Sequence, residues 1–210
     1  MKYLKRKLLG YYDYTVVLTY VGMLFGVTGI TLVMKNIFWG AAGCLMAAGI
    51  CDMFDGTVAG TKERTYAEKQ FGIQIDSLSD LICFGVLPGL FVFRLCKEKT
   101  FALVIAAGYI LCALIRLAYF NVCESERQQT ENGARTCYTG LPVTSSALII
   151  PAIYALFSNS YLCLPFLAAE GILFLSPISI KKPKALGKAI IAGIGLFVAS
   201  MLVLGVIHGA

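Results

Sequence analysis

Four aspartates stand close together in a chain that otherwise carries little charge. They are Asp52, Asp55, Asp76 and Asp80, in the segment DMFDGTVAGTKERTYAEKQFGIQIDSLSD. The first pair is spaced i, i+3 and the second i, i+4, so in helices each pair lies on one face. Carboxylates gathered in this way repel one another, and one or two divalent cations with hard oxygen ligands remove that repulsion. The pattern predicts a site for Mg²⁺ or Mn²⁺, with Ca²⁺ as the alternative ion; four separate carboxylates facing water fit the paired register less well.

Apolar segments on both sides of the aspartates are long enough to cross a membrane. The chain has 210 residues, of which 58% are hydrophobic and 14% charged, and this leaves too few polar residues to cover a soluble surface. A helix crosses a hydrocarbon core of about 30 Å with about 20 residues. Apolar segments are expected at residues 14–34, 37–55, 73–95, 100–121, 141–158, 161–179 and 188–207. The prediction is an all-α, polytopic transmembrane helical bundle.

Charge divides the chain into three parts. Residues 1–13 mix Lys and Arg with Leu and Tyr, the pattern of an amphipathic helix on an anionic membrane surface. Residues 14–180 are expected to form one membrane domain with a six-helix core. Residues 181–210 begin with the basic stretch KKPK and are expected to add a seventh, C-terminal span.

The positions of Lys and Arg predict which side of the membrane the aspartates face. With the N-terminus inside, the segments 1–13, 56–72, 122–140 and 180–188 hold 13 of the 18 basic residues. The opposite side holds 4, and Arg116 lies within a span. Because cytoplasmic loops carry the excess of positive charge, the site is predicted to face the cytoplasm, in a multi-pass cell-membrane protein. The net charge of +6 is explained in the same way, so no nucleic-acid partner is expected.

The cysteines do not indicate a metal site. There are eight of them, mostly in apolar segments and without a C-x-x-C pair, beside a single histidine. Zinc is therefore not expected. Free thiols are expected, with a Cys123–Cys137 pair across a polar loop as the alternative.

Small residues are interleaved with the aspartates in the order D-x-x-D-G-x-x-A-…-G-x-x-x-D-x-x-x-D. This order resembles the signature of the CDP-alcohol phosphatidyltransferase family, with Gly56, Ala59 and Gly72 at the small positions. In the family pattern an arginine usually follows the alanine, whereas here Gly60 takes that place. Arg64, four residues further on and therefore expected on the same face of a helix as Gly60, is the candidate for the missing role. The interval between the alanine and the next glycine is also longer than usual.

Later blocks resemble the phosphatidylserine synthase branch of that family. They are LICFGVLPG after Asp80, IRLAYFNV at residues 115–122 and YTGLPVTSSA at residues 138–147. The resemblance runs from about residue 14 to residue 180. It implies transfer of a phosphatidyl group from CDP-diacylglycerol to L-serine among membrane phospholipids, with release of CMP, by a homodimer. The alternatives are another acceptor (glycerol phosphate or an inositol phosphate), an ether-lipid donor or, outside this class, an ion-coupled transporter.

The resemblance also implies roles for residues. Two metal ions are expected on the four aspartates, and Asp80 is expected to remove the proton of the serine hydroxyl as well. CDP binding is implied for Asp52, Asp55, Gly56, Ala59, Arg64, Gly72 and Asp76. A buried arginine needs an anionic partner, which makes Arg116 a candidate for binding serine or phosphate. Further candidates for this role are Asn121, Thr144, Ser145, Lys181 and Lys182.

Overall fold

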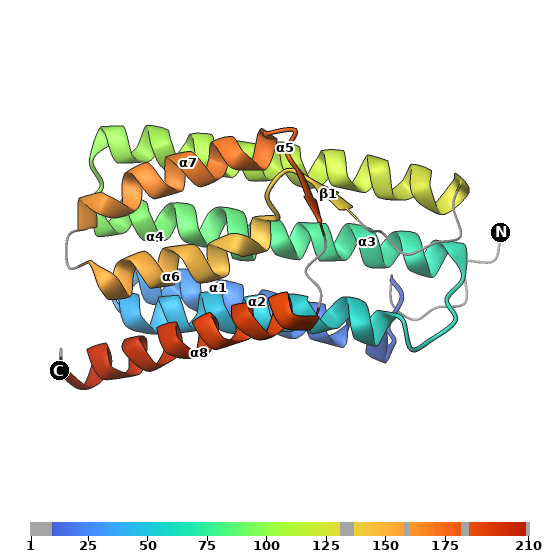
Figure 1. The fold of residues 1–210 in the computed structure, drawn as a ribbon, viewed down its shortest axis with the longest axis horizontal. Helices are drawn as coiled ribbons and strands as arrows, with labels where there is room; N and C mark the ends of the chain where they lie inside the picture. The colour runs from blue at the N-terminus through green and yellow to red at the C-terminus, as the bar shows by residue number, and fades with distance from the viewer. Residues whose placement is uncertain (1–9, 131–136, 158–159, 182–184, 209–210) are drawn as a thin grey trace.

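The computed structural model describes residues 10–130, 137–157, 160–181 and 185–208. It is an elongated bundle whose helices run roughly along one axis, with the start of the described chain and the end of the last helix at opposite ends (Figure 1). The helices are α1 (Val17–Met34), α2 (Phe38–Ala59), α3 (Tyr66–Asp80), α4 (Leu87–Leu95), α5 (Thr100–Thr130), α6 (Ser146–Leu156), α7 (Cys163–Leu175) and α8 (Ala185–His208). Short 3₁₀ turns occupy Tyr14–Val16, Val143–Ser145 and Ser160–Leu162.

The expected polytopic helical bundle is confirmed. Four helical stretches are long and apolar enough to cross a membrane: Tyr14–Met34, Phe38–Ala59, Tyr66–Leu95 and Thr100–Glu126. Shorter apolar helices follow at Val143–Leu156, Cys163–Leu175 and Gly193–Leu204. The last of these belongs to α8, which packs on α2 and α6 and buries Val198 and Leu202. The expected seventh span, α8, is therefore part of the core, while the division of the chain at residues 13 and 180 stays a prediction.

Several helices extend beyond the apolar segments at the end of the bundle that carries the aspartates. α2 continues to Ala59 rather than residue 55, α5 to Thr130 rather than residue 121, and α3 begins at Tyr66 rather than residue 73. A capping box fixes this early start. The Thr65 hydroxyl accepts the Glu68 N–H at 3.3 Å, and the Glu68 carboxylate accepts the Thr65 N–H at 2.9 Å. Apolar runs mark the part of a helix suited to hydrocarbon, and polar turns continue the helix outside it.

Buried glycines let α1 pack closely against α4 and the turn before it, which continue the helix that carries Asp76 and Asp80. A Cβ on Gly26 would lie 2.6 Å from the Cys83 Sγ, and a Cβ on Gly29 would lie 2.7 Å from a methyl carbon of Leu87. Small residues permit this spacing between membrane helices. α1 is thereby fixed against α4 and the turn that precedes it.

The third long helix changes its winding in the middle. α3 passes into α4 through a π-helical turn, Leu81–Val86. Pro88 has no N–H to donate to the Phe84 carbonyl, four residues earlier. That carbonyl instead accepts the Tyr109 hydroxyl at 2.7 Å and the Ser146 hydroxyl at 3.3 Å. The π-helical turn thus ties α5 and α6 to this helix beside the aspartates, and such turns are frequent at functional sites.

Two short strands accompany the helices and are an addition to the all-helical prediction. β1 (Cys137–Thr139) pairs antiparallel with β2 (Ser179–Lys181). The pairing joins the segment after α5 to the segment after α7. Gly140, at φ +77°, ends this connection, and its N–H donates to the Ile178 carbonyl at 2.8 Å.

Two further expectations concern the start of the chain and the thiols. Residues 1–9 of the predicted amphipathic helix lie outside the described residues, and residues 10–13 are not helical. The cysteines whose side chains are described are free thiols, Cys123 among them. The alternative Cys123–Cys137 pair is therefore wrong, and Cys123 instead lies within α5 as an unpaired thiol.

Candidate active site

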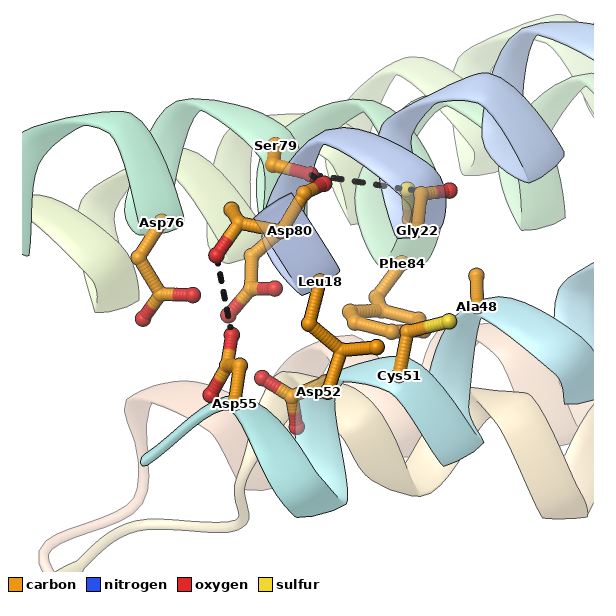
Figure 2. Close-up of a pocket in the computed structure, with 12 residues that line it drawn as sticks. Leu18, Gly22, Ala48, Cys51, Asp52, Asp55, Asp76, Ser79, Asp80 and Phe84 are labelled. Atoms are coloured by element: carbon orange, nitrogen blue, oxygen red, sulfur yellow. Dashed lines mark hydrogen bonds between the residues drawn. The ribbon is translucent and has the colours of Figure 1, made fainter. Parts of the chain in front are cut away.

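The structure brings the four aspartates together in one pocket. Figure 2 shows Asp52 and Asp55 on α2 facing Asp76 and Asp80 on α3. One carboxylate oxygen each of Asp52, Asp76 and Asp80 lies within 4.8 Å of the other two, and Asp55 lines the same pocket. Three oxygens at this spacing can share one metal ion, and carboxylates are ligands that Mg²⁺ and Mn²⁺ prefer.

The hydrogen bonds in the pocket leave room for a cation. The Asp76 Oδ1 is buried and has no hydrogen-bond partner among the described residues. The carboxyl groups of Asp55 and Asp76 lie within hydrogen-bonding reach of each other, which requires a proton or a cation between like charges. A buried oxygen without a partner is costly, and a metal ion at this position would satisfy it. The residues present therefore fit a divalent cation.

Hydroxyl groups from two other elements orient the aspartates. The Thr19 hydroxyl of α1 donates to the Asp55 Oδ2 at 3.3 Å. The Thr144 hydroxyl, in the turn before α6, lies within hydrogen-bonding reach of Asp52. Asp55 and Asp52 thus each have a hydroxyl neighbour from a different part of the chain.

The aspartate pocket is small. Its volume is about 10 Å³, which is space for about one water molecule, and Leu18, Ala48 and Phe84 supply apolar wall. An ion fits this volume and a nucleotide does not. The residue after Asp55, Gly56, borders open space, because a Cβ there would meet no atom within 4 Å. A larger ligand therefore has room beside Gly56, one residue from Asp55.

The position of Arg64 differs from the one expected. α2 ends at Ala59, Gly60 is its C-terminal cap, and Arg64 lies in the connection before α3. The expectation that Gly60 and Arg64 share a helical face is therefore wrong. Instead, an Arg64 Nη1 lies 3.0 Å from the position of a Cβ on Gly72, and its buried Nε has no hydrogen-bond partner among the described residues. Gly72 makes room for this guanidinium group.

Two other candidates lie away from the pocket. Asn121 accepts the Ser77 hydroxyl at 2.6 Å and donates to the Gln74 side chain at 3.5 Å. These bonds place Asn121 in the contact between α5 and α3. Arg116 is buried, with its guanidinium carbon 5.6 Å from the ring centre of Phe120. Neither side chain lines the aspartate pocket.

The structure places Thr144 and Ser145 differently, although they are neighbours in the chain. Thr144 contacts the pocket through Asp52, whereas the Ser145 hydroxyl turns to α7 and donates to the Glu170 Oε1 at 2.7 Å. Lys181 is the last residue of β2 and its side chain lies outside the described part of the structure, as does all of Lys182.

Sequence reasoning missed Glu170 and Thr19. Glu170 is 2% exposed and is the one charged residue in the apolar segment 161–179. An ionisable residue at membrane depth is a functional candidate by default, so this signal was available. Thr19 offers no comparable signal, because a threonine in an apolar helix usually bonds to its own backbone.

Comparison with known proteins identifies the family of this chain. A family model described as CDP-alcohol phosphatidyltransferase matches residues 15–181. The chain is also similar to proteins named CDP-diacylglycerol–serine O-phosphatidyltransferase. One from Saccharomyces cerevisiae is 33% identical over 147 residues, which is 64% of this chain and 52% of that protein. The chain thus spans about half the length of this relative.

This chain covers more of two further relatives with the same name. The protein from Methanocaldococcus jannaschii is 32% identical over 166 residues, or 79% of this chain and 72% of that protein. The protein from Helicobacter pylori is 29% identical over 173 residues, or 74% of this chain and 69% of that protein. The family match includes all four aspartates and the turn that carries Thr144.

Proposed function

The chain belongs to the CDP-alcohol phosphatidyltransferase family, and from this premise we propose that it transfers a phosphatidyl group from CDP-diacylglycerol to L-serine. The serine hydroxyl oxygen attacks the phosphorus on the lipid side, the bond from that phosphorus to the CMP oxygen breaks, and CMP leaves. The observation that carries the proposal is the cluster of Asp52, Asp76 and Asp80 within 4.8 Å. The names of the relatives support CDP-diacylglycerol and serine as substrates.

Each aspartate has a proposed role. Asp52, Asp55 and Asp76 hold divalent cations, Mg²⁺ or Mn²⁺, and with them the nucleotide diphosphate. A bound cation supplies positive charge opposite the diphosphate and its leaving oxygen. Asp80 accepts the proton of the serine hydroxyl and also contributes a ligand oxygen. Its position on α3, facing α2 across the pocket, supports both roles.

The nucleotide is proposed to lie at the open side of the pocket. Gly56 offers open space there, Ala59 ends α2 one turn further on, and Arg64 brings a guanidinium group over Gly72. A guanidinium group binds phosphate oxygens through two parallel hydrogen bonds. Arg64 therefore takes the part of the family arginine that Gly60 replaces.

The surroundings of the site are also proposals. The distribution of Lys and Arg supports a cytoplasmic orientation of the pocket. Arg116, beside Gly140, is proposed to bind serine carboxylate or lipid phosphate. Lys181 and Lys182 are proposed to bind lipid phosphate at the membrane surface. A homodimer is proposed from the family resemblance alone.

An acceptor panel tests the proposal. The purified protein is assayed in mixed micelles for CMP release from CDP-diacylglycerol with L-serine, glycerol phosphate, an inositol phosphate and water. Serine-dependent release is expected, with the other acceptors near the water background. Faster release with a phosphorylated acceptor would contradict the serine assignment, and no release with any acceptor would contradict the transferase.

A further inference from the structure

The apolar helix α7 carries a buried carboxylate that the proposed reaction does not use. Glu170 is 2% exposed. Its Oε1 accepts the Ser145 hydroxyl at 2.7 Å, and its Oε2 is buried without a hydrogen-bond partner among the described residues. A carboxylate at this depth is costly, so its contact with Ser145 needs a reason beyond the stability of the bundle.

Ser145 belongs to a turn that is held from three sides. Its neighbour Thr144 lies within hydrogen-bonding reach of Asp52 on α2. The Ser146 hydroxyl is shared between the Val143 carbonyl at 2.9 Å and the Phe84 carbonyl at 3.3 Å, and Phe84 lines the aspartate pocket. Three consecutive hydroxyl side chains therefore attach to α2, α7 and the π-helical turn. Thr144 and Ser145 lie in the 3₁₀ turn and Ser146 begins α6. Consecutive side chains of such turns point in different directions, which allows this arrangement.

The helices around the turn pack closely, so the turn has little freedom to move alone. A Cβ on Gly49 of α2 would lie 2.6 Å from the Ala147 Cβ, at the start of α6. A Cβ on Gly171, next to Glu170, would lie 3.4 Å from the Tyr109 Cα. These contacts hold α6 against α2 and α7 against α5. Within this frame, Ser145 is the hydrogen-bonded link between α7 and the residue that contacts Asp52.

We propose that Glu170 is a positioning residue for the aspartate site. Through Ser145 it fixes the turn that carries Thr144, and Thr144 fixes the carboxylate of Asp52 toward Asp76 and Asp80. The inference rests on the proposed function, because it takes Asp52 as a metal ligand. Hydrogen bonds that orient a ligand typically change metal affinity about 10- to 100-fold when they are removed.

Metal binding by the purified full chain in detergent tests the proposal without any assay of turnover. Free Mn²⁺ is measured by electron paramagnetic resonance during titration of wild type, Glu170→Leu, Thr144→Val and the double variant. Glu170→Leu and Thr144→Val are each expected to weaken Mn²⁺ binding about 10-fold or more. Because both act through one path, the double variant is expected to bind no more weakly than either single variant.

Conservative variants separate positioning from general damage. Glu170→Gln keeps an acceptor oxygen for Ser145, and Thr144→Ser keeps the hydroxyl, so both are expected to bind Mn²⁺ within about twofold of wild type. Leu167→Ala, a fully buried position on α7, is the matched control; it is expected to lower the melting temperature and leave Mn²⁺ affinity unchanged.

Four results would overturn the proposal. They are wild-type affinity in Glu170→Leu, equal losses in Glu170→Gln and Glu170→Leu, additive losses in the double variant, and an equal loss in Leu167→Ala. Wild-type protein that binds no Mn²⁺ would overturn the metal site itself and this inference with it. A normal wild-type titration with an unaffected Glu170→Leu would overturn the inference alone.

Discussion

α2 and the continuous helical stretch from α3 to α4 have very different surroundings at their two ends. At one end, Phe38 and Trp39 of α2 meet Phe91 of α4 and Tyr154 of α6, with ring centres 4.7–6.2 Å apart. At the other end, the helices bring four carboxylates together. The aromatic end gains stability from burial and ring contacts, whereas the carboxylate end places like charges side by side. Stability and chemistry are thus separated along the helices, so substitutions at the two ends should have opposite effects.

The largest effect is expected at the carboxylate end. Asp80→Asn removes the proposed proton acceptor and should lower kcat about 10³-fold, while the melting temperature stays unchanged or rises because one like charge is gone. CMP release and thermal unfolding in the same detergent measure both quantities. Glu63→Gln, an exposed residue in the α2–α3 connection, removes the same charge as a control. An Asp80→Asn protein with more than a tenth of wild-type activity would contradict the role.

Truncation of a side chain at the aromatic end should lower stability and leave activity nearly unchanged. Phe91 is fully buried, and Phe91→Ala should lower the free energy of unfolding by about 3–5 kcal/mol through lost packing and a residual cavity. At a temperature where the variant is folded, kcat is expected to stay within about twofold of wild type. Denaturant unfolding in detergent and CMP release give the two values. Lost activity without lost stability would show that the two ends are coupled.

A smaller effect is expected where the nucleotide is proposed to bind. Arg64→Ala removes one charge-assisted contact, worth about 1.5–3 kcal/mol, and should lower kcat/KM for CDP-diacylglycerol about tenfold or more. Titration of the lipid in mixed micelles measures this value. Lys69→Ala, which removes an exposed charge of the same sign on α3, serves as the control. Equal kinetics for Arg64→Ala and Lys69→Ala would remove Arg64 from the site.

The smallest effect concerns the segment before α1, which contacts the α2–α3 connection. The hydroxyl of Thr15, together with Lys62 at 2.9 Å, lowers the pKa of Asp13 to about 2. A lowered pKa stabilises the folded state above the ordinary carboxyl pKa, and this contribution is lost as the pH falls toward 2. Asp13→Asn should therefore lower the melting temperature slightly and equally at every pH from 5 to 8. A difference that changes across this range, measured by thermal unfolding, would contradict the assignment.

The sequence was sufficient for the parts that depend on local patterns. Paired spacing predicted that the aspartates converge, and apolar runs predicted every long helix. The sequence did not predict the contacts between segments that are distant in the chain. The helical-turn argument for Arg64 failed because α2 ends at Ala59, and the partners of Asp52 and Asp55 come from residues 92 and 36 positions away in the chain. The π-helical turn follows from Pro88 only once Tyr109 and Ser146 are known to lie beside Phe84.

Metal dependence of serine-linked CMP release tests the central claim most directly. Protein treated exhaustively with EDTA is assayed with CDP-diacylglycerol and L-serine, before and after Mg²⁺ or Mn²⁺ is restored. The carboxylate cluster predicts that chelation abolishes release, that either ion restores it, and that Asp52→Asn needs at least about tenfold more ion for half-maximal rate. Full activity after complete chelation would contradict the account.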